Sequence, residues 1–184
     1  MTVNFFTEIS GFSYGVFGKN LALEINRQTE VCLAPSFYKL MCVEKNETAE
    51  LSKMLNRIEQ ISFNDTGVMF ANGNQMFRFT GRKKIGITFF FTDNLEKSWI
   101  NQLKQLDAVC VPSKWQADIL KKYSINANVI QPGVNIDIFK KNAAKKVNIK
   151  FDKTNKFKFF SVGKWDSRKN QKLAVEAFCE EFSH

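Results

Sequence analysis

The side chains best suited to binding chemistry lie near the C-terminus, in the stretch "GKWDSRKN" from Gly163 to Asn170. Gly163 closes an apolar run, and Lys164, Arg168 and Lys169 gather just before a predicted helix. Cations at a helix N-terminus oppose the helix dipole. A phosphate ligand would offset that conflict, because cations and free backbone N–H groups both attract it. The sequence therefore favours phosphate binding here over a merely solvated turn.

A glycine-rich stretch, "GFSYGVFG", follows the first predicted strand. It lacks the G-x-G-x-x-G spacing of dinucleotide-binding loops. Gly11, Gly15 and Gly18 would let the backbone approach a ligand closely, and the next helix would point its free N–H groups at an anion. A tight turn between a strand and a helix explains the same glycines equally well. Both interpretations stay open.

A third polar loop, "FFFTDN", ends another apolar run. Asp93 is predicted to cap the following helix, because short acidic side chains accept hydrogen bonds from the first free N–H groups. The alternative role for Asp93, together with Thr92, is a polar contact to a substrate hydroxyl. Ligands of open α/β sheets bind where such loops gather, at the carboxyl ends of the strands.

Two kinds of apolar segment alternate along the chain and would position these loops. Short β-prone segments predict strands at residues 3–9, 30–36, 67–72, 83–91, 107–113 and 127–134. Between them, apolar residues recur every three or four positions, as in helices. The clearest helical patterns cover residues 17–25, 47–61, 94–106 and 113–123. In the last of these, Ser113 and Gln116 have the spacing of a capping box.

This alternation predicts an α/β fold: a Rossmann-like, doubly wound parallel sheet covered by helices on both faces. We expect this domain to span residues 1–140. The polar, lysine-rich residues 141–156 are predicted to be a linker. Residues 157–184 then supply the first strand and helix of a second Rossmann-like domain. The helix carries Leu173, Phe178 and Phe182 on one face, and without its sheet that apolar face is expected to be exposed.

Composition narrows the classes of function. The 184 residues carry a net charge of +9, which suits a nucleotide diphosphate, an anionic membrane surface or a nucleic acid. No motif of a known nucleic-acid reader is present, so specific nucleic-acid binding rests on charge alone. The only histidine is His184, which argues against a zinc site or a histidine-based triad. Cys32, Cys42, Cys110 and Cys179 show no Cys-x-x-Cys pair and are predicted to be reduced, buried thiols.

The N-terminus lacks the basic start and apolar stretch of a signal peptide, and no apolar run reaches the roughly 20 residues of a membrane helix. We therefore expect a cytoplasmic protein. Peripheral attachment to a membrane stays open because of the basic charge.

Three stretches resemble GT-B-fold glycosyltransferases of family 4, also called group 1. "LDAVCVPSKWQADILKKYSINANVIQPGVNIDIF", residues 106–139, is similar to the family's "D-x-v-x-vpS-x-w" helix and its "v-i-x-n-G-V-d-x-x-x-F" linker. "FFSVGKWDSRKNQKLAVEAF", residues 159–178, is similar to the entry to the family's second domain, "f-l-f-V-G-R-x-x-x-x-K-G-x-x-x-l-i-x-A-f". "GFSYGVFGKNLALEI" resembles the N-terminal glycine loop and first helix, although this stretch alone is less specific.

The resemblance implies transfer of a sugar from a nucleotide diphosphate sugar, with retained anomeric configuration and with no metal or other cofactor. The donor would lie between two Rossmann-like domains, mainly on the second, and the first domain would bind a glycan, lipid or protein acceptor. Lys164 and Lys169, next to Gly163, fall where the family has the Arg and Lys that hold the donor diphosphate. Tyr14 and Gly15 fall in the loop near donor and acceptor. No catalytic residue is identified.

The chain departs from the family pattern at three positions. Lys164 replaces an Arg, which keeps the charge but loses the bidentate fork. Asn170 stands where Gly is usual, and Phe91 stands where relatives place a Glu or a His-containing motif. Because Phe cannot accept a hydrogen bond, acceptor contact at Phe91 is in doubt.

The family's second domain continues beyond the segment present here and includes a pair of glutamates separated by seven residues. We therefore expect this chain to be a fragment with little or no transfer activity of its own. The alternative is a non-catalytic binding module that acts with a partner chain. The donor sugar, its base, the acceptor and the oligomeric state are not specified by the sequence.

Overall fold

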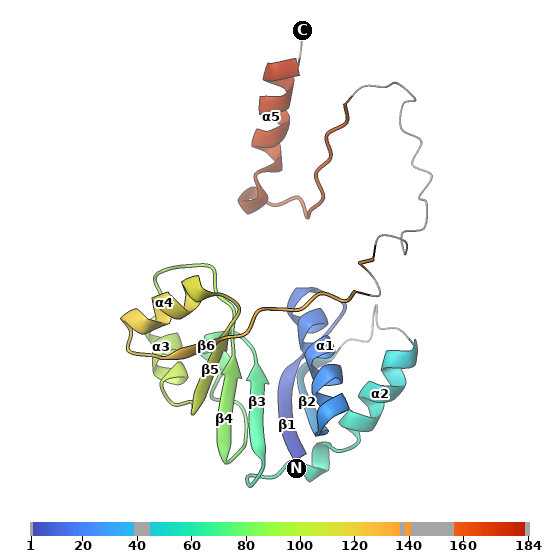
Figure 1. Cartoon of the computed structure of the whole chain (residues 1–184), viewed down its shortest axis with the longest axis vertical. Helices are drawn as coiled ribbons and strands as arrows, with labels where there is room; N and C mark the ends of the chain where they lie inside the picture. The colour runs from blue at the N-terminus through green and yellow to red at the C-terminus, as the bar shows by residue number, and fades with distance from the viewer. Residues whose placement is uncertain (1, 39–44, 137–138, 141–156, 183–184) are drawn as a thin grey trace. The chain divides into compact units, whose positions relative to one another are not determined.

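The computed structural model describes residues 2–38, 45–136, 139–140 and 157–182 of the chain (Figure 1). The chain divides into two compact units, Met1–Val134 and Asn135–His184. The predicted linker at residues 141–156 and the thiol of Cys42 lie outside the described residues.

The first unit is built on a six-stranded sheet in the order β2-β1-β3-β4-β5-β6. All five neighbouring strand pairs are parallel. The strands are β1 (Thr2–Ile9), β2 (Glu30–Tyr38), β3 (Thr66–Phe70), β4 (Lys83–Ile87), β5 (Ala108–Val111) and β6 (Ala127–Val129). The helices are α1 (Ser13–Gln28), α2 (Lys45–Leu55), α3 (Lys97–Leu103) and α4 (Lys114–Lys122), with short 3-10 turns η1 (Ile58–Gln60) and η2 (Gly73–Gln75). The predicted α/β class with a parallel, Rossmann-like sheet is confirmed.

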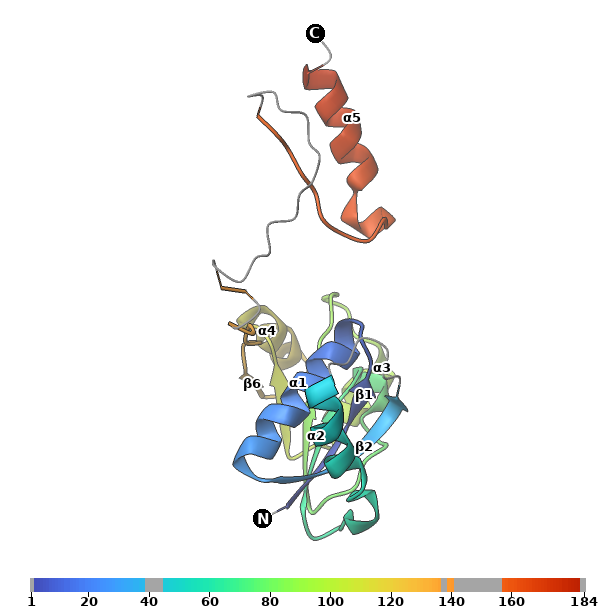
Figure 2. The same cartoon turned by 90° about the vertical axis from the view of Figure 1, so that its right-hand side faces the viewer.

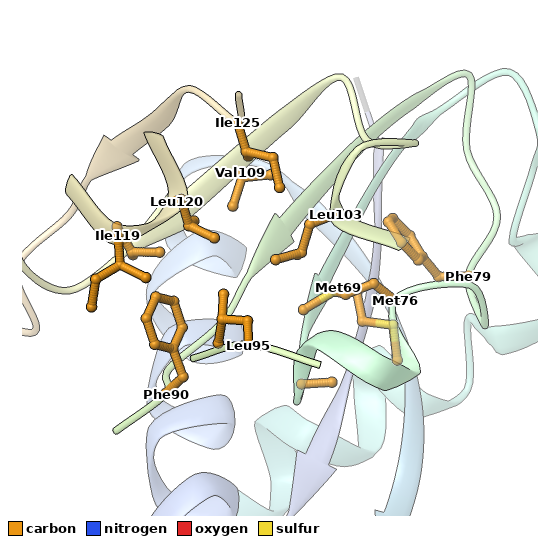
Figure 3. Close-up of a cluster of buried hydrophobic side chains, with 12 residues drawn as sticks. Met69, Met76, Phe79, Phe90, Leu95, Leu103, Val109, Ile119, Leu120 and Ile125 are labelled. Carbon is orange, nitrogen blue, oxygen red and sulfur yellow. The ribbon is translucent and has the colours of Figure 1, made fainter. Parts of the chain in front are cut away.

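Two apolar cores cover opposite faces of the sheet. One packs α1 and α2 on β1, β2 and β3, with Phe5, Leu33, Leu51, Met54 and Phe70 among its fully buried side chains. The other packs α3 and α4 on the opposite side, and Figure 3 shows Leu103, Val109, Ile119 and Leu120 meeting Met69 and Phe90 there. Each strand contributes alternate side chains to the two faces, as period-two geometry requires.

Helices α1 and α2 lie on the same face of the sheet, next to each other (Figure 2). The largely buried side chains of Lys19 on α1 and Glu47 on α2 form an ion pair at 2.6 Å. The connection from β1 to β2 and the connection from β2 back past β1 to β3 run in opposite directions across the sheet. If both connections were right-handed, their helices would lie on opposite faces. The prediction of helices on both faces is confirmed for the sheet as a whole, with α1 and α2 on one face and α3 and α4 on the other.

The predicted helix at residues 47–61 is shorter than its apolar pattern. Helix α2 ends at Leu55, and Ile58 is exposed in the turn η1. Arg57 follows the helix and donates to the Val31 carbonyl at 3.2 Å, while pairing with Glu30 at 3.3 Å. These contacts bring the chain back to β2 and account for the early end.

In the second unit, α5 (Gln171–Phe182) confirms the predicted helix, preceded by the 3-10 turn η3 (Ser167–Lys169). The strand predicted just before it is wrong: residues 157–162 form no strand. A strand needs a hydrogen-bonded neighbour, and the described residues supply none. The apolar face of α5 is exposed, as expected, with Leu173, Phe178 and Phe182 each about half accessible.

The exposure of the cysteine thiols differs between the two units. Cys32 and Cys110 are buried in the first unit, as predicted, and burial raises the pKa of each thiol above its ordinary value. Cys179 lies on α5 and is exposed, so the prediction of burial is wrong there. The reason is that Cys179 lies off the apolar face of α5, which is lined by Ala174, Ala177 and Phe178.

Candidate functional site

A cavity of about 240 Å³ lies at the carboxyl ends of β1 and β3. The chain leaves β1 toward β2 on one side and returns to β3 on the other, so the strand order reverses at this point. Open α/β sheets bind their ligands at such switch points. The lining includes Glu8, Tyr14, Ser36, Phe70, Asn72 and Gln75.

The turn after β1 holds one acidic group at the cavity. The Ser10 hydroxyl donates to the Glu8 carboxylate at 2.7 Å. Ser10 is buried and Glu8 is half-buried, so this hydrogen bond orients the carboxylate. A carboxylate with lone pairs to spare can accept further hydrogen bonds from ligand hydroxyls.

The glycines of the "GFSYGVFG" stretch act mainly in packing. Helix α1 begins at Ser13, so Gly15 and Gly18 lie inside the helix rather than in a loop. A Cβ on Gly15 would overlap the backbone N of Ser10, and one on Gly18 would come within 2.7 Å of the Glu8 carbonyl. Small residues thus let α1 cross close over the end of β1. Of the three predicted site residues here, Tyr14 lines the cavity, whereas Gly11 and Gly15 are not among its lining residues.

Four aromatic rings form a rigid wall beside the cavity. Tyr14 stacks on Phe70 with ring centroids 5.0 Å apart, and Phe17 and Phe89 complete the cluster at centroid distances of 4.7 to 6.0 Å. The Tyr14 hydroxyl donates to the Phe89 carbonyl at 3.0 Å. Burial raises the pKa of Tyr14 above its ordinary value, so its hydroxyl stays protonated at neutral pH. The wall therefore ties the turn after β1 to the loop after β4.

The loop after β4 is held from a second side by α4. Ser113 caps this helix by accepting from the Gln116 backbone N–H at 3.3 Å, as predicted. The Gln116 side chain does not return to Ser113 but donates Nε2–H to the Phe90 carbonyl at 2.6 Å. The next residue, Phe91, points into solvent, with 79% of its surface exposed.

Thr92 and Asp93 lie on that same loop, both exposed, and neither lines the cavity. The Thr92 hydroxyl accepts from the Asn94 N–H at 3.2 Å. The prediction that Asp93 caps the next helix is wrong, because α3 begins at Lys97. Leu95 explains why the helix begins later than predicted. Its side chain is buried in the core, and its N–H donates to the Tyr123 hydroxyl at 3.4 Å.

The basic turn of the second unit is held by one side chain that the sequence patterns did not identify. Gln171 donates Nε2–H to the Lys164 carbonyl at 2.7 Å and accepts from the Asp166 N–H at 3.4 Å. Lys164 and Lys169 are exposed, and within the described residues neither forms an ion pair. Their ammonium groups are thus available to an anion.

Asn170 has a left-handed backbone, with φ 58° and ψ 30°. Among non-glycine residues, Asn enters this region most readily. Asn170 therefore has a backbone conformation that Gly would also adopt.

The sequence patterns missed the polar lining of the cavity. Glu8 is the one charged residue of β1, which is a signal that could have identified it. Asn72 and Gln75 follow β3, and their position beside the end of β1 depends on the strand order. Ser36 lies on β2, which reaches the cavity only because β2 pairs with β1.

No protein-family model matches the chain, and no curated protein is significantly similar to it. Within the described residues, no helix combines the length and apolar character needed to cross a membrane. The same residues contain no cluster of three or more His, Cys, Asp or Glu side chains suited to a metal ion.

Proposed function

We propose that this chain is part of a retaining glycosyltransferase of the GT-B type. It would bind a sugar acceptor on its first unit and the diphosphate of a nucleotide sugar on its second. The observation that carries the proposal is the polar cavity at the switch point of a parallel sheet, on the turn that also carries one of the family-like stretches. Its donors and acceptors suit the hydroxyls of a sugar.

On the acceptor side, Glu8 would accept hydrogen bonds from sugar hydroxyls, and Asn72 and Gln75 can both donate and accept. The aromatic wall that includes Tyr14 and Phe70 supplies an apolar surface for a sugar ring. Sites of this kind combine apolar walls with a few polar groups that fix orientation.

On the donor side, Lys164 and Lys169 would hold the diphosphate as point charges. The turn that carries them is fixed by Gln171 and by the left-handed Asn170. Stabilising the charge of a leaving diphosphate is the main electrostatic demand of sugar transfer from a nucleotide sugar.

Titration calorimetry with uridine, guanosine and adenosine diphosphates tests the donor side. We expect at least one diphosphate to bind, and Lys164→Ala and Lys169→Ala each to weaken that binding about tenfold, as for loss of a hydrogen bond to a charged group. Lys172→Ala is the matched control, because it removes the same charge from α5, where Lys172 pairs with Glu176 at 3.5 Å. It should leave the affinity unchanged.

Equal losses in all three variants would mean that the diphosphate senses only net positive charge. That result, or no binding of any diphosphate, would contradict a donor site at this turn.

A non-catalytic binding module that acts with a partner chain is the second candidate, and Phe91 favours it. An exposed Phe stands where the resembled family places a hydrogen-bonding side chain. If the diphosphates bind but no nucleotide sugar is ever turned over by the protein together with its partners, the binding module is the better account.

A further inference from the structure

A second cavity, of about 420 Å³, lies on the face of β1 and β2 opposite α1 and α2. It shares Glu8, Ser36 and Gln75 with the cavity at the switch point. Because the same three side chains line both, the two cavities are adjacent. A ligand that occupied both would extend from the switch point along β1.

The alternation of side chains along β1 and β2 determines which residues line the second cavity. Phe5 and Ile9 on β1 face the core under α1 and α2. Phe6 and Glu8 face the other way, and Ala34 pairs with Phe6 from the neighbouring strand. On this face Phe6 packs against Phe79, with ring centroids 5.8 Å apart, and Gln75 of η2 borders the same cavity.

The second cavity is amphipathic. Phe6, Ala34 and Met69 form its apolar floor, while Glu8 and Arg78 supply opposite charges. The Arg78 guanidinium lies 5.0 Å from the ring centroid of Phe77, a cation–π contact that orients it. Within the described residues, Arg78 forms no ion pair with Glu8 or another acid.

This combination matches one ring of a sugar chain. A pyranose ring has an apolar face that suits the floor, and hydroxyls at its edge that suit a carboxylate acceptor and a guanidinium donor. The cavity volume lies within the range of roughly 300–1,000 Å³ usual for small-ligand sites. It is therefore large enough for a ring beyond the one at the switch point.

We propose that the acceptor is an oligosaccharide of two or more units, with its terminal ring at the switch point and its second ring in the cavity along β1 and β2. This inference rests on the proposed function, which assigns the switch-point cavity to the acceptor. Glu8, shared by both cavities, would contact both rings. Arg78 would contact the second ring alone.

The test compares monosaccharides with matching disaccharides on the whole chain. The probes are glucose and maltose, mannose and mannobiose, and N-acetylglucosamine and chitobiose, with binding measured by saturation-transfer NMR titration. For at least one pair, the disaccharide should bind about tenfold more tightly than its monosaccharide, as expected for added hydrogen bonds to charged groups. No gain in any pair, or no binding of any probe, overturns the inference.

Two variants locate the gain. Ala34→Trp should fill the second cavity and abolish the preference for the disaccharide, while monosaccharide affinity stays within about twofold. Arg78→Ala should weaken disaccharide binding about tenfold and leave monosaccharide binding unchanged. Arg78 is exposed, so this variant keeps the test valid if Ala34→Trp does not fold.

Arg82→Ala is the matched control for Arg78→Ala. It removes the same charge from the same connection between β3 and β4, at a residue that lines neither cavity. A disaccharide preference that survives both Ala34→Trp and Arg78→Ala overturns the inference.

The donor experiment separates this inference from the proposed function. If diphosphates bind at Lys164 and Lys169 but no disaccharide preference exists, the second-ring site fails and the glycosyltransferase proposal stands. If the disaccharide preference is found and the diphosphates do not bind, the donor assignment fails instead.

Discussion

Gly15 and Gly18 show how a single missing Cβ shapes the candidate site. Each lets α1 pass close to the end of β1, where Ser10 and Glu8 are held. Glycines at this turn invited a ligand-binding interpretation from sequence, but the close contacts that they permit are with the protein itself. They act on the site by positioning Tyr14 and the Glu8 turn.

Substitution tests this role directly. Gly15→Ala and Gly18→Ala should each lower the free energy of unfolding by about 1–3 kcal/mol, because the new methyl group forces the backbone apart. Gly133→Ala is the control, since a Cβ there meets no atom within 4 Å. Urea unfolding measures all three. Unchanged stability of the Gly15 and Gly18 variants would mean that α1 does not pack this closely.

Tyr14 gives a prediction that depends on pH. Tyr14→Phe removes the hydrogen bond to the Phe89 carbonyl and should cost about 1 kcal/mol of stability near pH 8. Burial raises the pKa of Tyr14, so above about pH 10 the unfolded chain loses this proton before the folded one. The free energy of unfolding of the unsubstituted protein therefore falls as pH rises past about 10, and the variant lacks this contribution.

The difference in stability between the unsubstituted protein and the Tyr14→Phe variant should accordingly shrink between about pH 8 and pH 10.5. Urea unfolding at both values measures it. A difference that is constant or grows with pH would contradict a buried, protonated Tyr14.

At the scale of elements, the strands β1 to β6 were predictable because their apolar runs are short and bounded by turn residues. The side of the sheet taken by α2 was not predictable, because an amphipathic pattern says that Leu51 and Met54 are buried but not against which face. The second cavity, on the face of β1 and β2 opposite α1 and α2, follows from that placement. The prediction of a strand near Phe159 was wrong for a related reason. A strand forms only when a neighbouring strand pairs with it, and the local sequence does not contain that neighbour.

Helix α5 provides the prediction at this scale. In a Cys42→Ser protein, Cys179 should react rapidly with a thiol reagent, whereas Cys32 and Cys110 should react only on unfolding. Cys179 is exposed, and the other two thiols are buried with raised pKa values. Mass spectrometry of the labelled peptides identifies the reacting residue. Slow labelling of Cys179 would contradict its exposed position on α5.

At the scale of the whole molecule, both buried cores consist of residues from the first unit alone. A fragment of residues 1–134 should therefore fold, with a single cooperative transition in urea. Circular dichroism and tryptophan fluorescence from Trp99 and Trp115 report on that transition. A fragment without a cooperative transition would show that the first unit needs the rest of the chain.

The two proposed sites lie on different units, which is the central claim about how this chain binds its substrates. Backbone NMR of the isotope-labelled protein, titrated separately with a disaccharide and with a nucleotide sugar, tests that claim most directly. We predict that the disaccharide shifts signals around Glu8, Asn72 and Gln75, and that the nucleotide sugar shifts signals between Gly163 and Gln171. Shifts from both ligands on one unit, or shifts in neither region, would contradict the account.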